Sequence, residues 1–266
     1  MPTEHGAWIW LLGPFFLGAA AGGRFGVDLI WLLIAGLAVF LLRQPTTIVV
    51  KVLAGRRRSR ELTPGVIWMG IYATVAALAL IPLLGAGYNR LPLLALPGVP
   101  VFGWHLFLVS RRAERRRPGV EIVAVGVLSL MAPAAFWVAG GRSDQTAVVL
   151  WAICWLQSAA SIVFIHLRLH QREMEAVPPL LTRLRQGWRS LAYSLFNLAG
   201  GLSLFILLDY PLHIPLAFAI LFLDNLHGVL VPAIGHRPTR IGVRQLIFSI
   251  VFFVVSSVGM LGRAGA

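Results

Sequence analysis

The chain alternates long apolar runs with short polar connections, and this pattern constrains its fold more than any other feature. A hydrocarbon core about 30 Å thick is crossed by roughly 20 apolar residues, and only helices and closed barrels satisfy their backbone groups there. The sequence therefore predicts an all-α, polytopic transmembrane bundle that forms a single membrane domain over residues 1–266. About nine helices are expected, over residues 8–21, 27–42, 66–84, 91–109, 120–139, 147–165, 191–208, 214–234 and 246–261.

Composition excludes the other main classes of protein. Hydrophobic residues make up 58% of the chain and charged residues 12%, against about 45–50% and 25% in soluble domains. These values exclude a soluble globular enzyme, a disordered chain and a coiled coil. The one cysteine, Cys154, lies in an apolar run, so a disulfide framework is excluded. Residues 1–7 contain no Lys or Arg, which predicts a retained first helix and not a signal peptide.

Basic residues predict the orientation of the bundle. Of the 23 Lys and Arg residues, 19 fall in the connections after the second, fourth, sixth and eighth runs. Short basic loops are retained in the cytoplasm. We therefore expect a multi-pass protein of the bacterial inner membrane, with the N-terminus cytoplasmic and the C-terminus outside. The net charge of +13 is explained by this topology, so no nucleic acid partner is expected. The expected partners are membrane lipids and their anionic head groups.

Two runs contain prolines that suggest irregular helices. Pro92, Pro97 and Pro100 lie near the start of the fourth run, which we expect to be kinked or to begin late. Pro45 follows the second run, where we expect it to end the helix.

The eighth run contains the strongest signal of a polar core, because ionisable groups are costly at membrane depth. Asp224 lies at its middle, followed by Asn225, and His227 is one turn further along the same helical face. Two interpretations stay open. The Asp–His pair handles a proton or coordinates a cation, or it is hydrogen-bonded to another helix, for which Asn197 is a candidate.

A second set of polar residues is expected at the cytoplasmic side. Arg43, Gln44 and Lys51 follow the second run and form either the floor of an anion or head-group site or a helix end with snorkelling cations. The sixth run ends with residues that complete this candidate site: His166, Arg168, His170 and Glu173. His166, His170 and Glu173 share one helical stripe, which makes them weak candidates for a transition-metal site or, alternatively, an ordinary interfacial stripe.

The N-terminal string Glu4-His5-Gly6-Ala7-Trp8 precedes the first run, and the string from His236 to Gln245 precedes the last. Together they resemble the YwiC-like family of bacterial membrane proteins, so Glu4, His5, Gly6 and Trp8 are expected to be its N-terminal motif. The same residue types also suit the start of an interfacial helix, where an acid and a tryptophan are common.

In architecture the chain also resembles the UbiA-type intramembrane prenyltransferases. That resemblance implies nine helices and a cytoplasm-facing site at two connections, which correspond here to residues 43–51 and 166–175. It also implies two acid-rich motifs that hold magnesium on a diphosphate. This chain has no acid between Asp28 and Glu61, and only Glu173 and Glu175 at the second position.

Three functions are consistent with these features. The first is binding or processing of a lipid or isoprenoid with an anionic head group, and the second is proton-coupled or anion transport through the Asp224 cluster. The third is a role as an accessory subunit. The residues identify neither a cofactor nor a catalytic group.

Overall fold

The computed structural model describes residues 8–111 and 118–264, and within these ranges the regular structure is entirely helical. Eight segments are long and apolar enough to cross a membrane, and α1 is shorter. The fold class is therefore the predicted one, a multi-pass helical membrane protein. The helices are α1 (Ile9–Gly22), α2 (Val27–Leu53), α3 (Leu62–Gly85), α4 (Leu91–Ser110), α5 (Pro118–Leu128), α6 (Met131–Val138), α7 (Asp144–Gln171), α8 (Leu180–Leu208), α9 (His213–Leu230) and α10 (Pro238–Ala264), with the 3₁₀ turn η2 (Ser59–Glu61) before α3.

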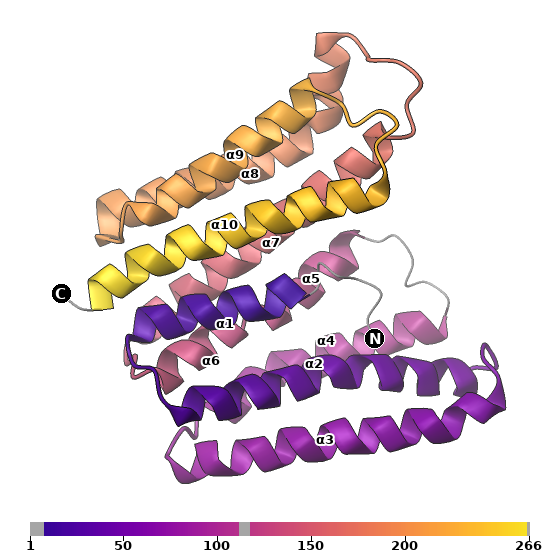
Figure 1. Ribbon diagram of the computed structural model, residues 1–266, viewed down its shortest axis with the longest axis vertical. Helices are drawn as coiled ribbons and strands as arrows, with labels where there is room; N and C mark the ends of the chain where they lie inside the picture. The colour runs from indigo at the N-terminus through magenta and orange to yellow at the C-terminus, as the bar shows by residue number, and fades with distance from the viewer. Residues whose placement is uncertain (1–7, 112–117, 265–266) are drawn as a thin grey trace.

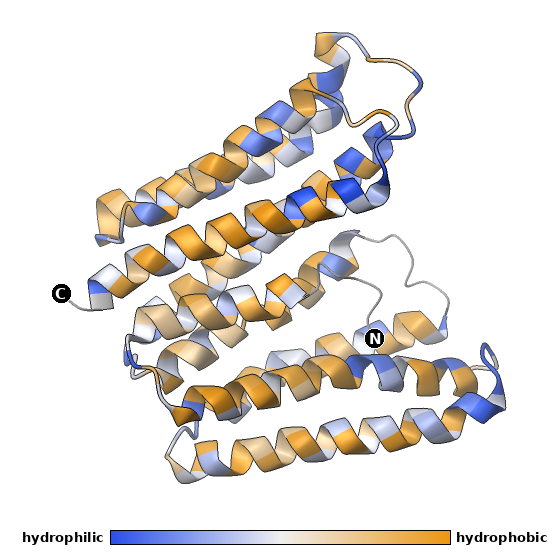
Figure 2. Cartoon of the chain, in the orientation of Figure 1, coloured by the Kyte–Doolittle hydropathy of each residue, from blue (hydrophilic) through white to orange (hydrophobic). Residues whose placement is uncertain are grey.

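Successive crossings run up and down beside one another (Figure 1). The connections after α2, α7 and α9 all lie at one end of the bundle, and α10 finishes at the other. Hydrophilic residues gather at the first of these ends (Figure 2), which we call the arginine-rich end. Its assignment to the cytoplasm stays a prediction.

The described residues form helices at all nine predicted runs, with two differences. The fifth run is divided at Ser129, where the chain turns between α5 and α6, although together the two helices are long and apolar enough to cross a membrane. The expectation of a late or kinked fourth helix is wrong about its start, because α4 begins at Leu91 and continues through Pro97 and Pro100. Neighbouring helices and local adjustments tolerate proline in membrane helices.

Helix α1 occupies the centre of the bundle and contacts both α6 and α10. Its close approach to α6 depends on Gly18, where an added Cβ would collide with the carbonyl oxygen of Ala132. Small residues allow such close backbone approach in membranes. One apolar cluster joins α1 to α2 and α6, and a second joins it to α7, α9 and α10. Helix α1 therefore links the two halves of the molecule.

Candidate functional site

An ion pair between a buried acid and a partly exposed arginine lies in the half of the bundle formed by α7–α10. Asp224 of α9 accepts hydrogen bonds through Oδ1 from Nε and Nη2 of Arg244 on α10, at 3.0 and 2.5 Å. The Asp224 side chain is 3% exposed and the Arg244 side chain 37%. Because a buried charge is tolerated only when it is paired, Arg244 explains how the acid is accommodated in α9. Asp224 lies about two turns from the end of α9, nearer the arginine-rich end than the bilayer centre expected from the sequence.

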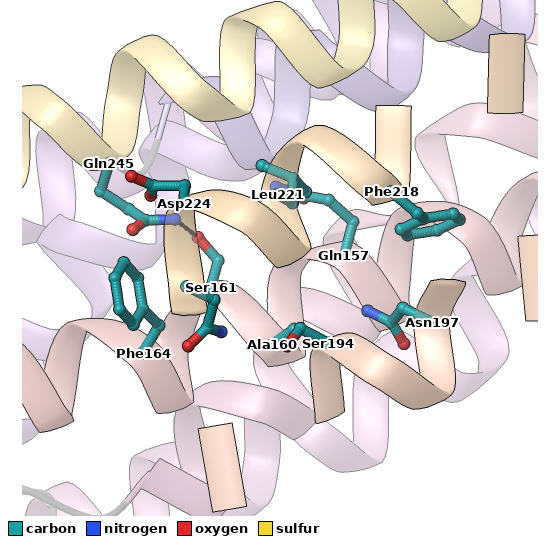
Figure 3. Close-up of a pocket in the computed structure, with 11 residues that line it drawn as sticks. Gln157, Ala160, Ser161, Phe164, Ser194, Asn197, Phe218, Leu221, Asp224 and Gln245 are labelled. Atoms are coloured by element: carbon teal, nitrogen blue, oxygen red, sulfur yellow. Dashed lines mark hydrogen bonds between the residues drawn. The ribbon is translucent and has the colours of Figure 1, made fainter. Parts of the chain in front are cut away.

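A small cavity with several polar side chains in its wall lies beside this pair (Figure 3). Its volume is about 20 Å³, and a cavity of roughly 10–15 Å³ is enough for one water molecule. It is therefore large enough for a water or a small ion, and too small for an isoprenoid. Helices α7–α10 supply its polar lining, which consists of Gln157, Ser161, Ser194, Asn197, Asp224, Asn225 and Gln245.

Most of these polar side chains form hydrogen bonds, chiefly to groups outside the lining. Gln157 donates from Nε2 to Ser249 Oγ at 3.2 Å, and Gln245 donates to Ser161 Oγ. Asn197 is 3% exposed and donates from Nδ2 to a backbone carbonyl, but its Oδ1 has no hydrogen-bond partner among the described residues. A buried acceptor without a partner costs about 1–3 kcal/mol. The cavity beside Asn197 is where a water or cation would supply that partner.

The structure brings together three of the four residues expected in the polar core. Asp224, Asn225 and Asn197 line the same cavity, and Asn225 is fixed by Ser190, whose hydroxyl donates to Asn225 Oδ1 at 2.8 Å. His227 is exposed. The expected Asp224–His227 pair is therefore replaced by the pair with Arg244.

Arg168, expected at a head-group site, is instead a buried contact between helices. It is 5% exposed, and its Nη1 donates to the carbonyl oxygens of Gly228 and Val231 at 2.6 and 2.7 Å. These carbonyls belong to the last turn of α9, where a cation complements the helix dipole. Arg168 therefore holds the end of α9 against α7.

The cluster on α2 lies within a helix and not in a loop. Pro45 does not end α2, which continues to Leu53. The hydroxyls of Thr46 and Thr47 donate to the carbonyl oxygens of Leu42 and Arg43, one turn earlier, at 2.7 and 2.8 Å. The cluster itself is half-buried and consists of Arg43, Gln44 and Lys51.

The proposed metal stripe on α7 is not assembled. His166 pairs with Glu121 of α5 at 3.1 Å, while His170 and Glu173 are exposed. Within residues 8–111 and 118–264, no group of three or more His, Cys, Asp or Glu side chains is placed to hold a metal ion.

The two candidate cytoplasmic clusters also lie apart. The connection after α2 and the connection after α7 are both at the arginine-rich end of the helices. Across the bundle, however, they lie toward opposite ends of the longest axis of the molecule (Figure 1). Helix α2 packs mainly on α3, whereas α7 packs on α5, α6, α8 and α10. Arg43 and His170 therefore do not form one site in this arrangement. Glu4, His5 and Gly6 lie outside the described residues. The rings of Trp8 and of Phe40 on α2 lie 5.2 Å apart between centroids, with their planes tilted by 57°.

Comparison with known proteins identifies the family. The model of the YwiC-like protein family matches residues 1–136, about half of the sequence. The chain belongs to the YwiC-like family. No curated protein matches this YwiC-like chain.

A solved structure of a UbiA-type prenyltransferase shares the fold of this YwiC-like protein. That structure is described as giving structural and mechanistic insights into the biosynthesis of digeranylgeranylglyceryl phosphate synthase in membranes. The match covers 96% of this chain and 94% of the other, with a TM-score of 0.58 and 12% sequence identity. The resemblance to UbiA-type proteins is therefore confirmed for the fold.

The described residues do not fit the magnesium–diphosphate site that the fold resemblance implies. Magnesium is bound through oxygen ligands, chiefly carboxylates and substrate phosphates. The end of α2 carries Arg43 and Lys51, and no acid lies between Asp28 and Glu61. Glu173, near the second position, is exposed and belongs to no cluster of acids in the described part of the chain.

Sequence reasoning missed several residues of the buried polar layer. The count of basic residues places Arg244 in a connection that sets topology, whereas it lies within α10 and pairs with Asp224. Gln157 and Ser161 lie one turn apart inside an otherwise apolar run. That spacing places both on one helical face, and it was the signal that could have identified α7 as a wall of the polar core.

Proposed function

We propose that this protein binds a membrane lipid with an anionic head group, such as an isoprenoid phosphate, at the arginine-rich end of the bundle in the bacterial cell membrane. The observation that carries this proposal is the fold, which is shared over nearly the whole chain with a structure described for digeranylgeranylglyceryl phosphate synthase. The compound in that name, digeranylgeranylglyceryl phosphate, is an isoprenoid lipid that carries a phosphate.

The distribution of charge supports direct recognition of the head group by cations. Arg43 and Lys51 replace the acids that a magnesium-dependent site would need, and arginine suits phosphate oxygens because its planar fork donates two parallel hydrogen bonds. The lipid tail would lie outside the helices, because α3, α4 and α8 expose most of their apolar surface.

The test compares two ligands that differ only in the head group. Purified protein is titrated with geranylgeranyl monophosphate and with geranylgeraniol, and binding is followed by native mass spectrometry. The proposal expects the phosphate to bind at least about tenfold more tightly, because hydrogen bonds to charged groups are the stronger class. Equal binding of the alcohol and the phosphate would refute it.

The cavity beside Asp224 favours a second candidate function, proton-coupled or anion transport. A paired acid, an acceptor without a partner and room for one water are the parts of a small-ion pathway through α7–α10. Sealed vesicles that contain the protein should move protons or anions when a gradient is imposed, and Asp224→Asn should abolish that flux. Equal flux in the wild type and the variant would exclude this function.

A further inference from the structure

The connection between α9 and α10 is fixed to α7 by hydrogen bonds. The amide of Gly235 donates to the carbonyl oxygen of Arg172 at 3.2 Å, and the amide of Ala233 donates to Oε1 of Gln171 at 3.4 Å. Ala233 is fully buried, and Arg168 binds the preceding turn of α9. These contacts hold the backbone of the connection in place, so its side chains project from a fixed position.

A surface hollow of about 500 Å³ opens beside this connection. Binding sites for small molecules commonly have volumes of about 300–1,000 Å³. The hollow is lined by cationic and hydroxyl donors together with one apolar side chain, and no acid lies in its wall. Its lining residues are Gly235, His236, Arg237, Thr239, Arg240 and Val243.

The cations of this hollow are not neutralised by neighbouring acids. Neither Arg237 nor Arg240 forms an ion pair with a carboxylate in the described part of the chain. Asp224 is the one acid in the sequence beyond Asp209, and it is paired with Arg244. The hollow also lies at the first turn of α10, where the helix dipole favours an anion.

An apolar stripe continues from the hollow along the outer face of α10. It begins at Val243, which lines the hollow and is 55% exposed. The stripe ends at Leu261, so it runs for about 27 Å at 1.5 Å per residue. Its members recur every three or four residues, as one helical face requires, and they are Val243, Ile247, Ile250, Val254, Val258 and Leu261.

We infer that this hollow binds the phosphate group of a membrane lipid, with Arg237, Arg240 and Thr239 as donors and the lipid chain along the stripe of α10. The inference rests on the proposed function and assigns its head group to the α9–α10 connection, in place of the clusters on α2 and α7. The stripe faces the bilayer, and a lipid that lies along it would hold its head group beside the hollow; this raises the effective concentration of a lipid-borne phosphate over that of a free one.

The hollow predicts which arginines control head-group binding. Arg237→Gln with Arg240→Gln should weaken binding of geranylgeranyl monophosphate at least about tenfold, because two charge-assisted donors are lost. The matched control is Arg58→Gln with Arg60→Gln, which removes two exposed charges that pair with no acid in the described residues, from the same end of the bundle outside the hollow, and should leave binding within about twofold. Thr239→Val tests the hydroxyl without a change of charge, and thermal unfolding of each variant confirms that it is folded.

The outcomes separate this inference from the proposed function. If wild-type protein prefers the phosphate but Arg43→Gln with Lys51→Gln loses binding while the hollow variants retain it, the function stands and the assignment to the hollow is wrong. If the control and hollow variants lose binding equally, general surface charge is responsible and the hollow is not a site. If millimolar inorganic phosphate displaces bound geranylgeranyl monophosphate as effectively as the lipid itself does, the stripe makes no contribution to binding.

His236 provides an independent readout of occupancy. Partial burial and the neighbouring cations Arg240, Arg168 and Arg244 lower the pKa of its imidazole below the ordinary value. A bound phosphate would offset that cationic field and raise the pKa. Histidine NMR signals recorded with and without the lipid phosphate, and assigned with His236→Gln, should show this rise. An unchanged His236 pKa at saturating ligand would overturn the assignment.

Discussion

The Asp224–Arg244 pair predicts an unequal response to removal of its two charges. Arg244→Gln leaves a carboxylate that is 3% exposed without its cation, and breaking a buried pair in this way costs about 3–5 kcal/mol. Asp224→Asn keeps an oxygen that can accept from Arg244. The remaining guanidinium is 37% exposed and can extend toward the arginine-rich end, so we expect a cost of about 1–2 kcal/mol.

Thermal unfolding of the purified protein, followed through its nine tryptophans, measures this difference. For domains of this size 1 kcal/mol corresponds to roughly 2–4 °C, so Arg244→Gln should lower Tm by roughly 6–20 °C and Asp224→Asn by roughly 2–8 °C. The double variant should resemble Asp224→Asn, because it leaves no unpaired buried charge. Arg185→Gln, an exposed charge on α8, is the control and should change stability by less than about 0.5 kcal/mol.

Two results would refute this reasoning. The first is a loss of stability for Asp224→Asn that is as large as the loss for Arg244→Gln. It would show that stability depends on the acid itself and not on its pairing with Arg244. The other is a double variant whose loss equals the sum of the two single losses, because residues that interact directly do not behave additively.

Three further predictions concern packing and topology. Gly18→Ala should destabilise the protein by about 1–3 kcal/mol in thermal unfolding, because its Cβ would collide with a backbone carbonyl of α6; Gly70→Ala, which meets nothing within 4 Å, should be neutral or stabilising by up to about 1 kcal/mol. Ser256→Ala should not lower Tm, because the hydroxyl is fully buried and has no partner in the described residues; a clear loss would reveal an unseen partner. A membrane-impermeant maleimide should label Ser59→Cys and Gly262→Cys from opposite sides of the membrane, since the native cysteine is buried; labelling from one side would contradict the seven crossings between the two positions, from α3 to α10.

The hydrophobic pattern predicted the crossings well because each helix in a bilayer must satisfy its own backbone, which makes span length a local property of the sequence. The ends of the helices were predicted less well. Helix α2 continues eleven residues beyond the predicted boundary at residue 42, through Pro45, to Leu53. Local sequence indicates where the apolar surface ends, whereas contact between α2 and α3 decides how far the helix continues past it.

The polar core illustrates the same division between local and tertiary information. The sequence identified Asp224, Asn225 and Asn197 because polar groups are rare in apolar runs. It could not select a partner for Asp224. His227 is adjacent along the helix, whereas Arg244 lies 20 residues away on a different helix, and only the packing of α9 on α10 brings it into contact.

The placement of arginines carries two kinds of information that a count cannot separate. Arg168 and Arg244 are among the 19 basic residues that predict the orientation of the bundle. In the structure, buried Arg168 donates hydrogen bonds to carbonyl oxygens at the end of α9, and Arg244 neutralises Asp224. Without them the bias is still 17 to 4, so the predicted orientation does not depend on them. Because both perform structural roles within α7–α10, substituting either one should change stability before it changes topology.

The arginines of the α9–α10 connection are different, because Arg237 and Arg240 are exposed and pair with no acid in the described residues. They can be removed without disturbing the buried network, and they are therefore where binding can be tested apart from folding.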